Sequence, residues 1–570
     1  MSPVSRSEPL AAVAKEYWEL MIEADPLYAT VLGDRRYDDR LRDITPKGRR
    51  RLDEQVEAVR KRCQAVEERP LSVADSLTRT ALLVDAERYL DRSSCDLDEW
   101  TVDPLEGPQV QLQNVESFQP VRTPAEGKAL AERWRAMGPF MDDHMANLRR
   151  GAAAGKFPAR ILVEKSIEEL QDLLGKQEKD WPFLRPLTQP HDEWSDADVK
   201  RFRSEVTAAT KDSIRPAFAR YLEFLKKDVL PGARPQDRPG IMHVRDGSRA
   251  YSKLIRFHTS LDLTADQLHQ TGLNEVARIN SEMEDLGEKV FGTRDRAKVL
   301  DRLRTDRSLY FDSRDEVEAT AERSLARAKA AIPKWFGRLP KADCVVVRME
   351  EHEEKHSTVA YYRQPAADGS RPGSYYINTS APETRPRYEA EALANHESIP
   401  GHHLQIAIAQ ELVDVPDFRR YTGVTALVEG WGLYAERLSD EMGLYSSDLD
   451  RMGVLSYDSW RACRLVVDTG MHAKGWSRDQ AIDYMMRNSA LAKNNVVNEV
   501  DRYITWPGQA LAYKTGQLEI MRLRKEAEKK LGGRFDIRAF HDAVLENGAL
   551  PLQALRQTVD RWAESRLQGD

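Results

Sequence analysis

Apolar residues recur at intervals of three and four through most of this chain, with charged residues between them. That spacing puts apolar side chains on one face of a helix. A helix start is marked clearly at Thr264, three residues before Gln267, in the arrangement of a capping box. The pattern predicts a mostly helical protein with helices over residues 9–32, 46–68, 73–92, 124–152, 158–175, 195–228, 264–290 and 313–331.

The pattern changes between residues 342 and 380, where three short runs rich in β-branched and aromatic residues replace the helical spacing. These runs, at 344–349, 358–362 and 374–378, predict a small three-stranded sheet. A stretch rich in proline and glycine separates the second run from the third, so we expect these two strands to be antiparallel. Helical spacing resumes near Arg387.

Charge is balanced along the chain, with 86 lysines and arginines against 93 aspartates and glutamates. A protein that binds nucleic acid or an anionic membrane usually carries a basic excess. The N-terminal residues lack the apolar stretch of a signal peptide, and no uncharged apolar run is long enough to span a membrane. The four cysteines are far apart and favour reduced thiols over a disulfide framework. We therefore expect a soluble cytoplasmic protein that binds neither nucleic acid nor a membrane; the pattern gives no indication of an oligomeric state.

Three of the twelve histidines fall within the eight residues from His396 to His403, in the run His-Glu-Ser-Ile-Pro-Gly-His-His. In the HExxH motif, two histidines four residues apart bind one zinc ion from the same face of a helix, and the glutamate beside the first is the general base. Here the position four residues after His396 is Pro400. Proline removes a helical hydrogen bond and glycine tolerates unusual dihedral angles. We therefore predict a bulge at Pro-Gly that brings His402 into the place of the second ligand, with Glu397 as the base.

His403 is the competing second ligand. On a straight helix it shares a face with His396 but lies about 10.5 Å further along the axis. Zinc–nitrogen bonds of about 2.0–2.1 Å do not span that distance without distortion, which favours His402.

Glu429 is the best candidate for a third ligand. It lies in an apolar segment with a glycine on its C-terminal side, and an acid in such surroundings is costly to bury without a cation. Glu436, two helical turns further on, can instead contact a metal ligand without binding the metal itself. Histidines and acids can also be satisfied by hydrogen bonds in a core, but the whole cluster favours a metal.

These segments resemble a bacterial family, the domain-of-unknown-function family numbered 885. The resemblance rests on residues 396–405, 429–436 and 502–516, and extends to 374–378 and 25–34, so it covers nearly the whole chain. It implies a large helical zincin-like fold around a substrate cleft, with the small sheet next to the metal-binding helix. That fold is similar to angiotensin-converting-enzyme-like and oligopeptidase-like metallopeptidases. We expect residues 1–340 to form one side of the cleft and residues 341–570 to form the catalytic region.

Further candidates lie in the last third of the chain. Arg461, Arg464, Asp468 and His472 follow one another at intervals of three and four, so they share one face of a predicted helix. That face is either an exposed salt-bridged surface, the commoner fate of such charges, or a wall of the cleft, which the aromatic neighbours and the resemblance favour. In a cleft, Arg464 is a candidate to bind a substrate carboxylate through two hydrogen bonds.

Tyr503 and Tyr513 are candidates of a different kind, because the resemblance implies a tyrosine hydroxyl that stabilises the oxyanion, with His472 as a further candidate. Either tyrosine can equally be a core residue with a tethered hydroxyl. Tyr376 and Asn378 are candidates to bind substrate, since their strand can offer backbone groups to an extended peptide.

The leading hypothesis is hydrolysis of a peptide or small amide bond by zinc-activated water. Zinc is held by His396, His402 and Glu429, and Glu397 moves the proton. One alternative is another metal-dependent cleavage of a C–N bond, in specialised metabolism, with the same ligands. A second alternative is a non-catalytic binding protein stabilised by zinc, which needs four protein ligands and has no use for Glu397.

Overall fold

The computed structural model describes residues 8–68, 71–349, 354, 358–366, 369 and 371–568. Helices make up most of this part of the chain, and the three short runs between residues 342 and 380 form strands. Residues 1–7, to which the expectation about a signal peptide applies, lie outside the described residues. Residues 367, 368 and 370 of the turn-rich stretch lie outside them as well. The prediction of a mostly helical fold with a small three-stranded sheet is confirmed.

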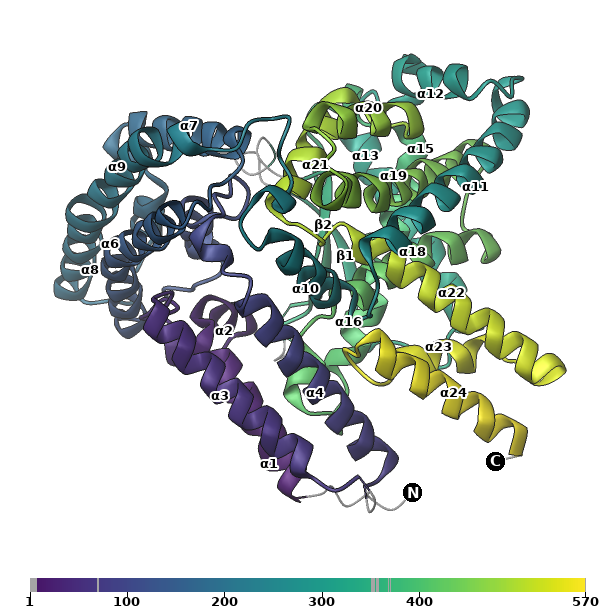
Figure 1. Ribbon diagram of the computed structural model, residues 1–570, viewed down its shortest axis with the longest axis horizontal. Helices are drawn as coiled ribbons and strands as arrows, with labels where there is room; N and C mark the ends of the chain where they lie inside the picture. The colour runs from purple at the N-terminus through teal and green to yellow at the C-terminus, as the bar shows by residue number, and fades with distance from the viewer. Residues whose placement is uncertain are drawn as a thin grey trace.

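The N-terminal helices form two groups (Figure 1). The first group, toward the bottom of the view, consists of α1 (Glu8–Ala24), α2 (Pro26–Leu32), α3 (Pro46–Ala65) and α4 (Val73–Ser93). After the short α5 (Pro108–Asn114), the lobe at the left is built from α6 (Pro124–Ala153), α7 (Arg160–Gly175), α8 (Asp196–Ala209) and α9 (Arg215–Phe224). The single helix predicted over 9–32 is two helices, because Asp25 caps the second by accepting a hydrogen bond from the amide of Tyr28.

The remaining helices fill the centre and the right of Figure 1. They are α10 (Gly247–Thr259), α11 (Ala265–Phe291), α12 (Arg296–Thr305), α13 (Arg314–Ala331), α15 (Arg387–Glu397), α16 (His402–Gln410), α17 (Asp417–Tyr421), α18 (Thr425–Glu441), α19 (Asp448–Ala473), α20 (Arg478–Asn488), α21 (Lys493–Thr505), α22 (Leu511–Leu531), α23 (Ile537–Leu545) and α24 (Leu552–Gln568). Helix α19 packs against α11, α15, α20 and α22. It is therefore a central element of this half of the molecule, and its polar residues are enclosed by neighbours.

The sheet consists of β1 (Cys344–Arg348), β2 (Ala360–Arg363) and β3 (Gly373–Ile377), in the order β1-β3-β2. Strands β2 and β3 are antiparallel, as the turn-rich stretch between them predicts, whereas β1 is parallel to β3. Strand β3 is thus the central strand and is paired along both edges. Helix α13 packs against β1, and α15 packs against β2.

The largest apolar core draws on both predicted regions of the chain. It joins Leu10 and Val56 of the first helices to Trp431 of α18 and Ile520 of α22. A second core lies in the left lobe, around Trp134 of α6. The division at residue 340 stays a prediction, and the shared core shows that the first helices support the region that follows it.

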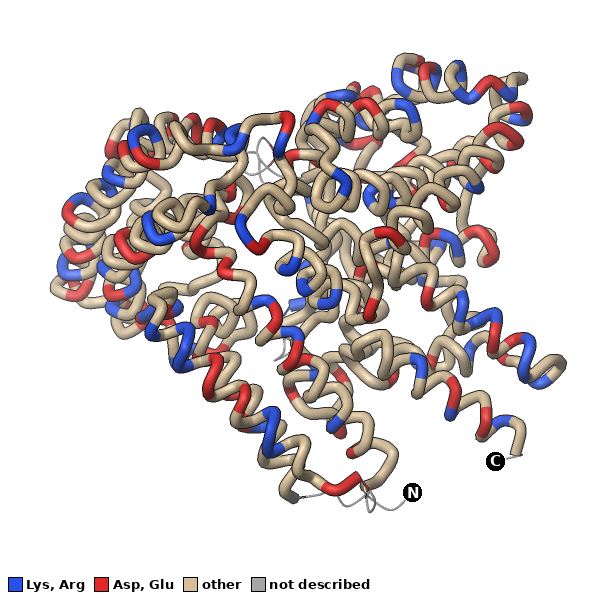
Figure 2. Tube along the Cα trace, in the orientation of Figure 1, with Lys and Arg blue, Asp and Glu red and all other residues tan. Residues whose placement is uncertain are grey.

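Basic and acidic residues are mixed along the whole trace (Figure 2), in agreement with the balanced composition. Across the described part of the chain, every helix is too short or too polar to cross a membrane. All four cysteines are free and buried, as their spacing predicts. The cytoplasmic location stays a prediction.

Candidate metal centre

The run of residues 396–403 spans a break between two helices. Helix α15 ends within the run, and α16 begins at His402. The intervening residues 398–401 include a cis peptide bond, Ile399–Pro400, and the indole Nε1 of Trp431 donates a 2.9 Å hydrogen bond to the carbonyl of the proline. The predicted bulge inside one helix is therefore wrong. The Pro-Gly pair lies between two helices, because the backbone departs from the helical conformation at Ser398 and again at Gly401.

The three predicted ligands come together at this break. His396, His402 and Glu429 each offer one atom to a group whose members lie within 4.8 Å of one another. Nε2 of His396 and Nε2 of His402 each lie 3.7 Å from Oε2 of Glu429. A tetrahedral zinc ion with bonds of about 2.0–2.1 Å holds its ligand atoms about 3.3 Å apart. The residue types and their spacing therefore fit a zinc ion.

Two glycines beside Glu429 allow its helix to approach the rest of the site. A Cβ atom at Gly432 would lie 2.5 Å from Cε1 of His396, and one at Gly430 would lie 2.5 Å from the backbone of Gly516 on α22. Neither position leaves room for a side chain. Gly430 and Gly432 thus permit the close packing of α18, and Gly432 lets the imidazole of His396 lie against that helix.

Glu436 supports His396 from the side away from Glu429. Its Oε1 lies 2.8 Å from Nδ1 of His396, and the carboxylate is buried. This hydrogen bond assigns the proton to Nδ1 and leaves Nε2 to face Glu429. Burial lowers the pKa of His396, but the two carboxylates outweigh it and raise the pKa to about 9. A proton on His396 and a metal ion are thus alternative ways to balance these acids.

His402 and His403 face different neighbours. Burial lowers the pKa of His402 to about 4, so the ring is neutral at pH 7 and its Nε2 can bind a cation. In His403, Nε2 lies 3.1 Å from the carbonyl oxygen of Ala342, and Nδ1 lies 3.0 Å from the hydroxyl of Tyr362. The carbonyl can only accept, so Nε2 donates to it and Nδ1 accepts from the tyrosine. Both nitrogen atoms of His403 are therefore occupied at the sheet, away from Glu429.

Glu397 is the last residue of α15. Burial raises the pKa of its carboxyl group to about 7, with the charge of Glu429 adding to this effect and His396 opposing it. Among the described residues, none donates a hydrogen bond to this carboxylate. A carboxylate with a pKa near neutral and no fixed partner can take up and release a proton.

The face of α19 that carries Arg461 and Arg464 is buried, so the alternative of an exposed salt-bridged surface is wrong. The two arginines are 5% and 2% exposed. Nε of Arg464 donates to the hydroxyl of Tyr503 at 2.9 Å, and Nη2 donates to Glu499 at 3.0 Å. Only Nη1 of Arg464 is without a partner among the described residues. The two-bond contact to a substrate that the sequence suggests for Arg464 is therefore unavailable while these bonds hold.

The two candidate tyrosines differ in how far their hydroxyl groups are occupied. The hydroxyl of Tyr503 donates to Glu499 at 2.7 Å and accepts from Trp460 and Arg464. These bonds use its whole capacity, so Tyr503 is the core residue with a tethered hydroxyl. The hydroxyl of Tyr513 has one long contact, 3.5 Å from Gln509, and the ring lies 4.2 Å from the guanidinium of Arg464. Tyr513 remains a candidate to donate to a ligand.

His472 is occupied by backbone groups. Its Nδ1 accepts a 3.0 Å hydrogen bond from the amide of Ile241, and its Nε2 lies 2.9 Å from the carbonyl oxygen of Tyr503. Burial lowers the pKa of His472 to about 3, which keeps the ring neutral. Because both ring nitrogens are occupied, His472 cannot stabilise an oxyanion as the sequence suggests. Its bond to Tyr503 joins α19 to α21.

The predicted substrate-binding residues of the sheet are engaged elsewhere. Tyr376 stacks on Tyr361 of β2, with ring centres 4.8 Å apart. The side-chain amide of Asn378 donates to the carbonyls of Glu354 and Thr358. Because β3 is paired along both edges, its backbone cannot pair with a substrate as well. We give neither residue a role in the reaction.

Tyr375 is the functional candidate that the sequence reasoning missed. Side chains alternate across a strand, so Tyr375 faces the side opposite to Tyr376. Tyr375 is buried, and burial raises the pKa of its hydroxyl, with the charge of Glu397 adding to this effect. The alternation with Ile377, whose apolar side chain marks the buried face, is the signal that could have identified Tyr375.

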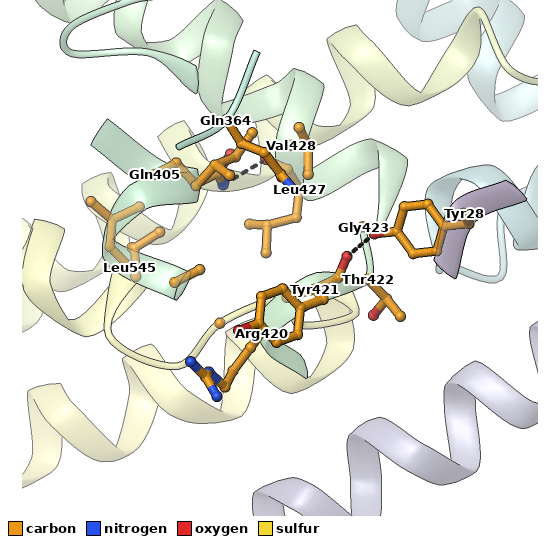
Figure 3. A pocket seen from close by; sticks show the side chains of 15 residues that line it. Tyr28, Gln364, Gln405, Arg420, Tyr421, Thr422, Gly423, Leu427, Val428 and Leu545 are labelled. Carbon is orange, nitrogen blue, oxygen red and sulfur yellow. Dashed lines mark hydrogen bonds between the residues drawn. The ribbon is translucent and has the colours of Figure 1, made fainter. Parts of the chain in front are cut away.

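A pocket of about 220 Å³ lies on the two helices that carry His402 and Glu429 (Figure 3). Gln405 of α16 and Val428 of α18 line one part of it. Nε2 of Gln405 donates to the carbonyl of Leu427, while its Oε1 is without a partner among the described residues. The opposite part is closed by Tyr28 of α2. A residue from the start of the chain thus contributes to a pocket on the helices that carry His402 and Glu429, although neither of these two side chains lines it.

This chain is similar to a family and to solved structures that are described without an activity. Residues 26–559 match the family described as bacterial protein of unknown function, DUF885. A crystal structure of a "putative lipoprotein" from Colwellia psychrerythraea shares 27% identity, with a TM-score of 0.89, over 98% of this chain and 99% of that one. A "putative lipoprotein of unknown function" from Shewanella oneidensis, 19% identical, shares the fold with a TM-score of 0.75 over 97% and 99%. No protein with a curated description matches.

Proposed function

This chain belongs to the DUF885 family of bacterial proteins of unknown function, and we propose that it is a zinc-dependent hydrolase of peptide or small amide bonds. The observation that carries the proposal is the group formed by His396, His402 and Glu429. Two histidines and a glutamate are a ligand set of catalytic zinc sites, which keep a fourth position open for water. The similarity to angiotensin-converting-enzyme-like and oligopeptidase-like metallopeptidases is part of this proposal.

Each residue around the group has a defined task in such a reaction. The bound zinc would supply the Lewis acid that polarises the substrate carbonyl and makes water a nucleophile at neutral pH. Glu397 takes the proton of the water and delivers it to the leaving amine, for which its pKa of about 7 is suited. Glu436 holds His396 in the required tautomer. The hydroxyls of Tyr375 and Tyr513 are the donors available to the oxyanion.

Two other functions draw on the same residues. Cleavage of a C–N bond in a specialised metabolite needs the same ligands and differs only in the substrate. A purely structural zinc site needs four protein ligands, whereas the group found among the described residues has three. A structural site also leaves Glu397 without a task.

The proposal is tested by digestion of a peptide library with purified protein of known zinc content. Glu397→Gln should keep about one zinc per chain and lose turnover by about 10²–10⁴-fold, because the amide cannot accept the proton. Glu391→Gln is the matched control on the same helix, since Glu391 bonds to Arg327 and Ser446 instead of the cluster. Turnover by Glu397→Gln at the wild-type rate, or wild-type protein that neither contains nor takes up zinc, would overturn the proposal.

A further inference from the structure

Arg461 is a buried arginine to which the described residues offer no hydrogen bond. Its Nε and Nη1 are enclosed and lack a partner among the described residues. Its one polar contact there is an ion pair of 3.9 Å between Nη2 and Oε1 of Glu436. A guanidinium carries five N–H donors, and a buried donor without a partner is unfavourable, more so when it is charged. The N–H groups on Nε and Nη1 of Arg461 therefore have no acceptor within hydrogen-bonding distance among the described residues.

Arg133 of α6 shows how this chain satisfies a buried arginine that has a structural role. Arg133 is 0% exposed, compared with 5% for Arg461. Its nitrogen atoms donate to the carbonyls of Arg40 and Tyr37 and to the side chain of Gln119, among other acceptors. Arg461, with two nitrogen atoms that have no partner among the described residues, is therefore not satisfied in the way that Arg133 is.

Arg461 lies beside the candidate metal ligands. The Oε1 atom of Glu436 that faces Arg461 also accepts the hydrogen bond from Nδ1 of His396. One carboxylate and one imidazole therefore separate the arginine from the nitrogen that faces Glu429. Arg464, one turn further along α19, also has an Nη1 without a partner among the described residues. Burial raises the pKa of Glu429, but His396 and His402 lower it more strongly, and the charge of Arg464 adds to the lowering.

Aromatic rings cover the faces of both guanidinium groups. Trp460 lies 4.1 Å from Arg461 and 4.3 Å from Arg464, and Tyr457 lies 4.5 Å from Arg461. Stacking on the faces leaves the N–H groups at the edges as the only positions for a ligand. A planar edge with several donors matches a carboxylate, which accepts two parallel hydrogen bonds.

We propose that Arg461, together with Nη1 of Arg464, binds a carboxylate of the substrate. The substrate is then a peptide or an N-acylated amino acid whose free terminal carboxylate lies close to the bond that is cut. This inference rests on the proposed function and names its substrate class. The carboxylate contact that the sequence suggests for Arg464 is thus assigned mainly to Arg461, because Tyr503 and Glu499 already occupy Nε and Nη2 of Arg464.

The alternative role for Arg461 is to balance the buried carboxylates around it, which needs a positive charge but no particular arrangement of donors. Lysine would supply that charge and would not supply the planar pair of donors. Arg461→Lys therefore separates the two roles, and Arg461→Met removes both. Arg451→Met is the control on the same helix, because Arg451 is exposed and paired with Asp440.

The test is calorimetric titration of the full chain, zinc-loaded and metal-free, with N-acetyl-L-phenylalanine and with its neutral amide. Wild type should bind the acid roughly 10- to 100-fold more tightly than the amide. Arg461→Met should lose that preference, Arg461→Lys should lose most of it, and Arg451→Met should retain it. The same pattern should appear in kcat/KM for peptides with free and amidated C-termini, mainly through KM.

Three results would overturn the inference. One is wild type without a preference for the acid, which includes the absence of any binding. A second is full preference in Arg461→Met, which would place the carboxylate on the metal. The third is full preference in Arg461→Lys, which would leave charge balance as the role. A preference for the acid in protein that takes up no zinc would instead count against the hydrolase proposal alone.

Discussion

Asp458 and Arg461 lie one turn apart on α19, and both are buried, at 1% and 5% exposure. Asp458 accepts from Lys514 and Arg437 and pairs with Arg278 at 3.3 Å. Lys514 in turn pairs with Glu275 at 3.1 Å. Every charge in this closed network has partners within the chain. Around Arg461 and the candidate metal ligands at the break between α15 and α16, some donors and acceptors have no partner among the described residues.

The difference separates a structural network from a binding site. A buried ion pair is tolerated when neighbours satisfy its remaining hydrogen-bonding groups, which is the case at Asp458. We call Arg461 and the candidate metal ligands the open network. It lacks a cation to pair with Glu429 and His402, and an anion to pair with Arg461. Those needs define what should bind there, and each can be tested separately from the stability of the fold.

The largest expected effect comes from breaking the closed network. Asp458→Asn leaves Lys514 and Arg437 without their shared anion, and we expect a loss of about 3–5 kcal/mol in the free energy of unfolding, measured by urea titration. The control is Asp440→Asn, because Asp440 is 46% exposed and pairs with Arg451 on the surface; its loss should be under about 1 kcal/mol. Equal losses in the two variants would show that the buried network around Asp458 stabilises the fold no more than a surface ion pair does.

A smaller effect on stability and a large effect on rate are expected at the sheet. Tyr375→Phe removes a donor near Glu397 and should lower kcat by about 10²–10³-fold, as for other single oxyanion donors. Tyr376→Phe is the matched control one residue away, on the opposite face of β3, and should keep kcat. If steady-state kinetics on a peptide found by digestion gave the same kcat for both variants, Tyr375 would have no part in the reaction.

The smallest effect concerns the protons of the open network. His396 has a pKa of about 9 without a metal, while His402, at about 4, is already neutral at pH 7.5. Zinc binding at pH 7.5 should therefore release about one proton from His396, and zinc affinity should weaken as the pH falls below about 9. Titrations in two buffers with different ionisation enthalpies measure the proton count. Affinity that stays constant between pH 6.5 and 9 would contradict this assignment.

The raised pKa of His396 also makes the stability of the metal-free protein depend on pH. Stability falls as the pH rises, whereas zinc affinity increases. Because the folded pKa of His396 is raised above its ordinary value of about 6.5, its contribution to stability is fully present below pH 6.5. That contribution is lost as the pH rises through about 9. Zinc-loaded protein should not show this loss, since the metal then takes the place of the proton.

Much of the helical fold was predictable because its signals are local. Periodic apolar residues give the helices, and proline with a capping aspartate gives the boundary at Asp25 that the periodicity alone misses. The parallel pairing of β1 with β3 had no such signal, because pairing between distant strands depends on the surrounding packing. Tyr375 was missed for a related reason: which face of a strand is buried depends on the core that the strand covers.

The ligand set was predictable from residue chemistry, since Glu429 and the clustered histidines are costly to bury without a cation. The backbone that joins the histidines was not predictable, because a pattern that continues on both sides of Pro400 is compatible with one bulged helix or two helices. The contrast between Arg461 and Arg464 could not be read from their spacing. It depends on Tyr503 and Glu499, which are distant in sequence and occupy one arginine but not the other.

The most direct test of the central claim is a zinc titration of His402→Ala beside His403→Ala. The two histidines are neighbours in sequence, but only His402 lies with His396 and Glu429, while both nitrogen atoms of His403 are bonded at the sheet. The account predicts that His402→Ala abolishes specific zinc binding, and that His403→Ala still takes up about one zinc ion, with affinity reduced at most about 10–100-fold. Loss of zinc in His403→Ala with retention in His402→Ala would contradict it.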